Sequence, residues 1–185
     1  GSLRLIGALI DTAVVSHRQG SADDAMEALH GFIKEHQVSQ KFKDKFNSVL
    51  SKTPWLHANT PHYVMALDNN MVENLCQTSK ADGVLASKIN FRFNPAFDVI
   101  TGTLSFVIYP VNRLQKMVEA SSPLDKPIFK LTLSAAESLP YKHSEINKNS
   151  AIWATNNGFY FKQAFDSILE TILIKLDKAL KNPNY

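Results

Sequence analysis

The alternation of apolar and polar residues along residues 87–93 and 99–109 predicts a β-hairpin. Each arm has one apolar face and one polar face, which is typical of a sheet with one solvated side. The turn falls at residues 94–98, where Asp98 is expected to fix the chain reversal. Gly102 interrupts the second arm and predicts a bulge or a close backbone approach. The apolar positions of the hairpin are Ile89, Phe91, Phe93, Ile100, Leu104, Phe106 and Ile108.

Two further segments have the pattern of strands. Residues 128–135 alternate in the same way, with Phe129, Leu131 and Leu133 on the apolar face. Residues 62–67 form a shorter strand candidate. The sequence therefore predicts a mainly antiparallel sheet of about four strands.

The first third of the chain is expected to be helical. Apolar residues recur at helical spacing from Ile6 to His17, Gly20 suits a helix C-cap, and residues 21–24 suit the N-cap of the next helix. A buried parallel strand over residues 3–10 is the rival interpretation, because this run is nearly continuously apolar. The helix is preferred because the apolar stripe continues through Val14.

Four more helices follow from apolar stripes and capping residues. The broadest stripe lies in the last one, over residues 158–180, and needs a sheet face to cover. Residues 112–126 are expected to be a surface excursion and residues 140–149 a polar loop. The inward positions expected in these helices are Met26, Leu29, Phe32 and Ile33; Phe42, Phe46, Val49 and Leu50, ending at Pro54; Met71, Val72 and Leu75 after an Asp68 cap; and Phe161, Phe165, Ile168, Leu169, Ile172, Leu173 and Leu176.

These elements predict one α+β domain over residues 1–185, an α/β sandwich in which helices cover the sheet. The length of 185 residues is sufficient for a single core. The net charge of +3 is mild, which argues against a dedicated nucleic-acid binder. Gly1-Ser2 has the look of a tag remnant, and the natural signal or anchor segment is expected to precede the residues given. The single Cys76 excludes an intramolecular disulfide.

Several short motifs, taken in order, resemble one group of proteins. They are Leu5-Ile6-Gly7-Ala8-Leu9-Ile10-Asp11, Pro54-Trp55-Leu56, Ala81-Asp82-Gly83-Val84-Leu85, and Trp153 with Asn156-Asn157 before the final helix. This order resembles uncharacterised bacterial envelope lipoproteins, whose sandwich is similar to the amino-terminal domain of TolB and to curli-secretion-type lipoproteins. The resemblance implies a periplasmic protein, anchored to the outer or inner membrane through a lipid-bearing Cys in a removed leader. Cys76 lies within an expected helix and is not that Cys.

Candidate chemistry is sparse. His57 and His62 flank Pro61 and could converge on a metal, although two surface histidines are the simpler interpretation. His30 and His36 are six apart, about 120° around an ideal helix, which is poor for a shared metal. Cys76 is a remote candidate nucleophile and fits a buried, inert thiol better. We expect no catalytic residue, no cofactor and no metal.

Other polar groups are also better explained by structure. Asp82 suits a turn, and an acidic first turn at Asp23, Asp24 and Glu27 suits a helix N-terminus. The tryptophans Trp55 and Trp153 border loops and are expected to cap the core. A group of lysines is typical of a solvated helix face, with anionic headgroups or nucleic acid as the rarer partner: Lys34, Lys41, Lys43, Lys45 and Lys52.

The sequence therefore predicts a non-catalytic envelope protein that acts as an interaction or assembly module. Its expected partner is an envelope protein or a cell-wall component, with the membrane reached only through an anchor outside these residues. One alternative is a carrier of a small apolar ligand, held between the last helix and the sheet; a second is a hydrolase. A cytoplasmic location is the alternative to the periplasm. Because a short sheet leaves edges exposed, a homodimer is a further expected assembly.

Overall fold

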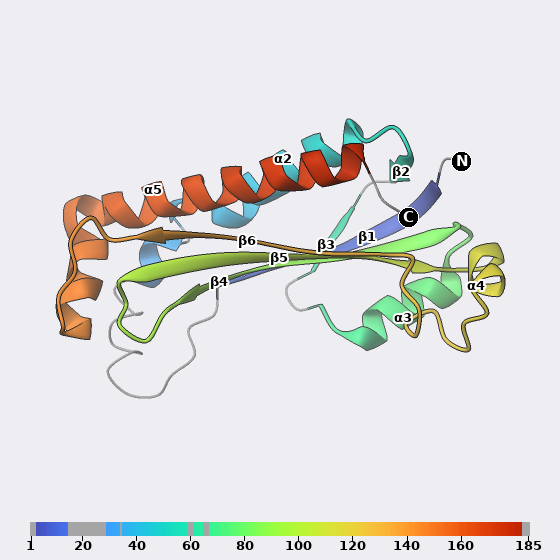
Figure 1. Ribbon diagram of the computed structural model, residues 1–185, viewed down its shortest axis with the longest axis horizontal. Coiled ribbons are helices and arrows are strands. Elements are labelled where there is room, and N and C mark those ends of the chain that lie inside the picture. Colours follow the sequence, from blue (N-terminus) through green and yellow to red (C-terminus); the bar gives the residue numbers. More distant parts are fainter. Residues whose placement is uncertain (1–2, 15–28, 34, 59–60, 65–66, 183–185) are drawn as a thin grey trace.

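The structure is a computed structural model that describes residues 3–14, 29–33, 35–58, 61–64 and 67–182. The described residues form a six-stranded sheet with helices on both faces, which confirms the α+β class (Figure 1). The strand order is β2-β1-β4-β5-β6, and β3 also pairs with β1. The antiparallel part contains three strands rather than about four: β4 (Gly83–Phe93), β5 (Val99–Pro110) and β6 (Phe129–Ser138).

The predicted hairpin is β4 and β5. They pair in one continuous register from Gly83 opposite Pro110 to Phe93 opposite Ile100. The turn is held by the Asn94 side chain, whose Oδ1 accepts from the backbone N–H groups of Asp98 and Val99 at 3.1 and 3.2 Å. Its Nδ2 donates to Asp98 Oδ1. Asn94 and Asp98 therefore fix the turn together, whereas the sequence indicated Asp98 alone.

The first segment is a strand, and the expected helix there is wrong. β1 (Leu3–Val14) pairs in parallel with β4 on one edge and with β2 (Leu56–Ala58) and β3 (His62–Val64) on the other. The rival interpretation, a buried parallel strand, is correct. An interior strand of a sheet with both faces covered can be apolar at every position. The apolar run at residues 3–10 is therefore compatible with both a helix and a buried strand. His17, Gly20 and residues 21–24 lie outside the described residues.

The helices form two unequal layers (Figure 1). α2 (Val38–Ser51) and α5 (Ile146–Lys181) cover one face of the sheet, while α3 (Asn69–Thr78) and α4 (Arg113–Met117) lie on the other face, at one end. Residues 29–33 are also helical. As expected, Asp68 caps α3 by accepting from the Met71 N–H at 2.8 Å. No described helix combines the length and apolar character that crossing a membrane requires.

α5 contains the predicted C-terminal helix but begins earlier, at Ile146, within the expected polar loop. The two helical parts meet at residues 155–158, where Asn156, Asn157 and Gly158 adopt left-handed φ values of 52°, 58° and 70°. An added Cβ at Gly158 would lie 2.8 Å from the Phe32 ring. This turn therefore sets the angle at which the long second half of α5 enters the sandwich.

The main core lies between the sheet and the α2–α5 layer. It includes the stripe of α5 predicted from sequence and the buried α2 residues Phe42, Phe46 and Leu50. A second, smaller cluster lies under α3 and contains Val72, Cys76, Val84, Ala86 and Val111. Met71, expected to be buried, is 41% exposed. Its position on α3 faces away from the sheet, because only a narrow stripe of this helix contacts β4.

Candidate functional site

An open groove of about 900 Å³ lies over the outer surface of α2 and α5. Its sides are formed by Lys41, Asp44 and Lys45 of α2 and by Asp166 and Glu170 of α5. The left-handed turn forms one end, where the Phe159 side chain is 52% exposed. The groove is thus a shallow, charged surface with one exposed aromatic ring.

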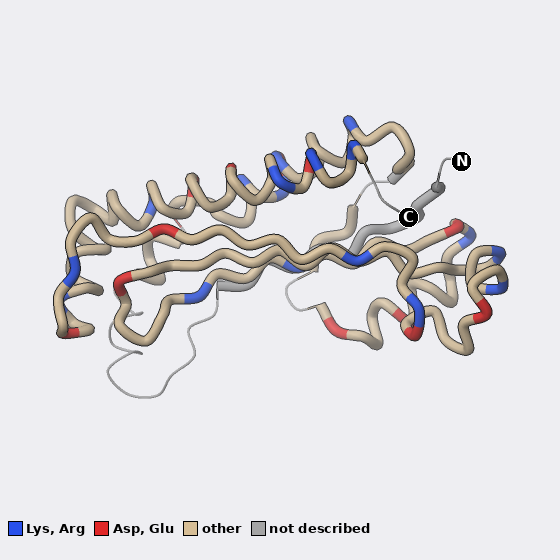
Figure 2. The backbone as a smooth tube through the Cα atoms, in the orientation of Figure 1, with Lys and Arg blue, Asp and Glu red and all other residues tan. Residues whose placement is uncertain are grey.

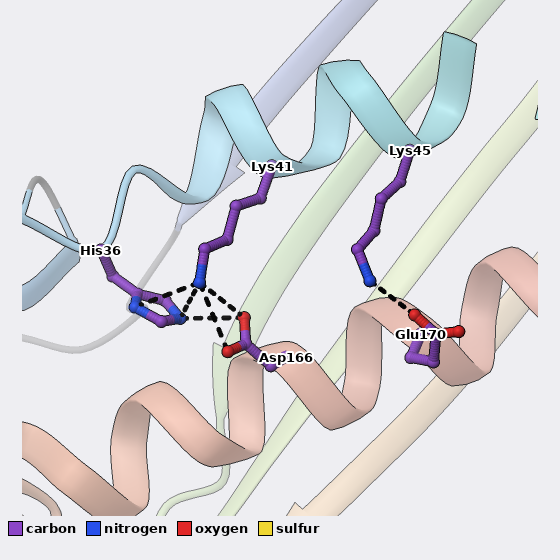
Figure 3. A network of polar contacts seen from close by, with 5 residues as sticks. All are labelled: His36, Lys41, Lys45, Asp166 and Glu170. Carbon is purple, nitrogen blue, oxygen red and sulfur yellow. Dashed lines mark hydrogen bonds and ion pairs between the residues drawn. The ribbon is translucent and has the colours of Figure 1, made fainter. Parts of the chain in front are cut away.

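A network of charges crosses this groove (Figure 3). Lys41 Nζ lies 3.1 and 3.3 Å from the two oxygens of Asp166, and His36 Nε2 lies 2.9 Å from Asp166 Oδ1. One turn further along both helices, Lys45 pairs with Glu170. Each acid of this network binds a base from the neighbouring element, so the network ties α2 to α5.

The contacts between the two helices repeat at a regular spacing and are called the α2–α5 ladder. They repeat because the two helices run in the same direction. Lys41 and Lys45 are four apart, as are their partners Asp166 and Glu170, and positions four apart share one helix face. Beyond the end of α2, Trp55 Nε1 donates to the Leu180 carbonyl at 2.6 Å, and these two partners are separated in sequence by the same 125 residues as the charge pairs. Figure 2 shows basic and acidic positions interspersed along these helices. Exposed pairs of this kind stabilise by at most about 1 kcal/mol each.

The predicted group of lysines is therefore only partly a solvated face. Lys41 and Lys45 pair with α5, and Lys43 Nζ lies 4.7 Å from the centre of the Tyr63 ring. Lys52 is exposed, and Lys34 lies outside the described residues. In the sequence, Asp166 and Glu170 have the same four-residue spacing as Lys41 and Lys45, which is a signal for this pairing. No local pattern, however, shows that two segments so far apart in the chain lie side by side.

The structure places the described histidines of the candidate metal pairs apart from one another. His57 lies opposite Arg4 and His62 opposite Leu9 on the same edge of β1, which places them about 16 Å apart along the strand. His57 and His62 therefore do not converge, and both are exposed. His30 is exposed and His36 binds Asp166. Within the described part of the chain, no three His, Cys, Asp or Glu side chains lie close enough together to hold a metal ion.

Cys76 is buried in the small core, where burial, assisted by the charge of Glu73, raises the thiol pKa to about 11. A thiolate is the reactive form, so this environment suppresses nucleophilic chemistry. The inert thiol expected from the sequence fits this placement.

We expect Cys76 to react with a thiol reagent at pH 8 at least about 100-fold more slowly in the native protein than in guanidinium chloride, since two pKa units lower the thiolate fraction by that factor. The same shift makes the protein lose stability as pH rises from about 9, the ordinary thiol value, towards 11. Absorbance kinetics measure the first effect and urea unfolding across pH the second. A native rate close to the unfolded rate would contradict the burial.

The β6 edge is a second candidate site. Leu139 N–H donates to the Asp98 carbonyl at 2.9 Å, so in this register the odd-numbered residues of β6 direct their backbone groups to β5. The even-numbered residues direct theirs away from the sheet. In the described residues, one of these outward groups has a partner, the Ser134 carbonyl, which accepts from Lys175 Nζ at 2.7 Å. The outward residues are Lys130, Thr132, Ser134, Ala136 and Ser138.

The two faces of β6 differ in chemistry. The outward residues carry exposed side chains that are mostly small and polar. The odd-numbered residues Leu131, Leu133 and Ala135 are half-buried against the main core under α5. On the same side, Ser167 of α5 donates to Glu137 Oε1 at 2.5 Å. The unpaired backbone groups of this edge therefore lie between the half-buried apolar face of β6 and its exposed, mostly polar face.

No family model and no curated protein matches the chain. Among solved structures, it is similar to a neuraminyllactose-binding hemagglutinin homolog from Helicobacter pylori, with 10% identity, a TM-score of 0.35, and coverage of 97% of this chain and 89% of that chain. It is also similar to a PelC dodecamer from Paraburkholderia phytofirmans, with 6% identity, a TM-score of 0.35, and coverage of 91% and 85%. Likeness at this level establishes neither the family nor the function of the chain. The resemblance to envelope lipoproteins stays a prediction.

Proposed function

We propose that this chain is a protein-interaction module of the bacterial cell envelope that binds partners along the β6 edge. The observation that carries the docking role is the row of outward N–H and C=O groups on β6, of which one has a partner in the described residues. The envelope location is motivated by the sequence resemblance. In this function the protein acts by binding and catalyses no reaction.

The edge suits the addition of a strand. Unpaired backbone groups on a sheet edge are a template for an extended segment of another chain, and main-chain hydrogen bonds then supply much of the affinity. The small side chains of Thr132, Ser134 and Ala136 let such a strand approach closely on the polar face. On the other face, Leu131 and Leu133 offer an apolar surface for alternate side chains.

The carrier alternative receives less support. Between α5 and the sheet, the Phe91 and Phe165 rings have centroids 4.1 Å apart, and an added Cβ at Gly102 would lie 2.4 Å from Ile168 Cγ2. Side chains thus occupy this part of the space in which an apolar ligand was expected. The hydrolase alternative draws on His57, His62 and Cys76, which lie apart from one another on β2, β3 and α3.

Crosslinking in cells tests the docking role. A photoreactive amino acid at Ala136, on the β6 edge, is expected to give discrete protein adducts, while the same group at the exposed Lys116 of α4 gives none. Thr132→Pro should abolish the adducts, because it removes an outward N–H without removing a hydrogen bond to β5. Thr132→Ala, which keeps that N–H, should retain them.

Two results would contradict the proposal. Equal adduct yields from Ala136 and Lys116, or none from Ala136, would exclude the β6 edge as the docking surface. Recovery of the natural full-length protein in the cytosolic fraction would exclude the envelope location while leaving the docking role intact.

A further inference from the structure

The β6 edge is self-complementary, and from this we infer that its occupant is a second copy of this chain. The inference rests on the proposed docking function and specifies the partner. The two β6 strands pair antiparallel about a two-fold axis that is perpendicular to the sheet and passes midway between Ser134 and its equivalent in the second copy. The product is one continuous sheet shared by two subunits, with an isologous interface.

The positions of the outward residues fix this register. Lys130, Thr132, Ser134, Ala136 and Ser138 are distributed symmetrically about Ser134. An axis at Ser134 pairs every one of them: Lys130 with Ser138 of the second copy, Thr132 with Ala136, and Ser134 with itself. Each pair exchanges two backbone hydrogen bonds, and any shifted register leaves some outward groups unpaired.

The axis also matches the two faces of the strand. A two-fold axis perpendicular to the sheet keeps both α5 helices on the same side. Leu131, Leu133 and Ala135 therefore meet the equivalent apolar face of the second copy, and the Ser and Thr side chains meet polar ones. A foreign strand would need this same alternation, whereas a second copy has it necessarily.

Charges across the axis are complementary. α5 runs antiparallel to β6, since Ser167 contacts Glu137 at one end and Lys175 contacts the Ser134 carbonyl further along. One helical turn beyond Lys175, Lys178 lies level with about residue 132, because a turn of helix spans about 5 Å. The facing positions of the second copy are Ala136 and Glu137, so Lys178 meets Glu137 of the second copy. Neither residue has an ion-pair partner within the described part of the chain.

Lys175 opposes the pairing. Its amino group occupies the Ser134 carbonyl at the axis, and a lysine at a sheet edge is a common guard against unwanted pairing. Self-association therefore has to displace Lys175. The nearby Ile174, which is 47% exposed, lies at the same level of α5 and gains an apolar contact near the axis. The dimer is thus expected to be weakened, not prevented, by Lys175.

Disulfide trapping tests the register. In the inferred dimer the two Ser134 Cα atoms lie about 5.5 Å apart, within disulfide reach, while the two Thr132 Cα atoms lie about 14 Å apart. Under mild oxidation, Ser134→Cys is expected to give a covalent dimer, and Thr132→Cys at least about tenfold less. Cys76 is buried and stays in both variants. Equal yields from the two variants, or no Ser134→Cys dimer, would overturn the register.

Analytical ultracentrifugation of the unmodified chain tests the dimer itself. The wild type should self-associate and Thr132→Pro should be monomeric, with circular dichroism showing that its fold is kept. Lys175→Gln should strengthen association about two- to tenfold by removing one competing hydrogen bond. Lys178→Glu should weaken association, and adding Glu137→Lys should restore it.

A wild type that stays monomeric at about 100 μM, a concentration well above that needed for a stable dimer, would overturn the second copy as occupant. If adducts with other proteins still formed at Ala136 in cells, the docking function would stand and its partner would be a different chain. If Ala136 gave no adducts either, both proposals would fail together.

Discussion

Phe165→Ala is expected to lower the free energy of unfolding by about 3–5 kcal/mol. The Phe165 side chain is 1% exposed, and its ring lies 4.1 Å from the centroid of Phe91 and 4.9 Å from that of Phe161. Truncation removes a large buried apolar surface and leaves a cavity where α5 covers β4. Because neighbouring rings hold their own packing positions, the cavity should close only in part. Urea unfolding monitored by circular dichroism measures the loss.

Phe159→Ala is the matched control. It removes the same atoms from the same helix, six residues away, but the Phe159 side chain is 52% exposed. The change in unfolding free energy should stay within about 0.5–1 kcal/mol, as for surface substitutions. Equal losses for the two variants would show that α5 does not face the sheet with the stripe described.

Gly102→Val is expected to destabilise the protein by about 3 kcal/mol or more. An added Cβ would lie 2.4 Å from Ile168 Cγ2, 3.1 Å from Phe91 Cε1 and 3.2 Å from Ile172 Cδ1. The two further methyl groups of valine cannot fit without moving α5 away from β5. Gly102→Ala should show a smaller loss in the same direction. Thermal and urea unfolding measure both.

Thr101→Val provides the comparison for this strand. Thr101 is adjacent to Gly102, but its side chain projects from the opposite, polar face of β5. The substitution keeps a β-branched side chain and should change stability by no more than about 0.5 kcal/mol. A tolerated Gly102→Val would mean that α5 does not approach β5 as closely as described.

Local sequence patterns predict the secondary structure correctly where one hydrophobic period, either the strand or the helical one, dominates a segment. The hairpin, β6 and the long part of α5 follow from alternation or a helical stripe sustained over many residues, and Gly102 marks the close approach that its sequence position suggested. The expected helix at β1 is wrong because the run of residues 3–10 is nearly continuously apolar in sequence and fits both periods. Its strand state depends on β4, β2 and β3, which come much later in the chain.

Tertiary contacts decide the remaining differences. The polar run at residues 140–149 predicted a loop, but Asn149 is fully buried in the first turn of α5. Its side chain donates to the carbonyls of Ala96 and His143 and accepts from the His143 N–H. The α2–α5 ladder and the outward groups of β6 likewise depend on pairing between distant segments. No local period could reveal them.

The interior position of β1 has a consequence for synthesis on the ribosome. Ala8 lies opposite Leu85, so at about 5–20 residues per second its β4 partner emerges roughly 4–15 s after it. Through that interval, β1 has no long neighbouring strand with which to pair. We therefore expect nascent chains of this protein to depend on chaperone protection more than those of a protein whose neighbouring strands are consecutive in sequence.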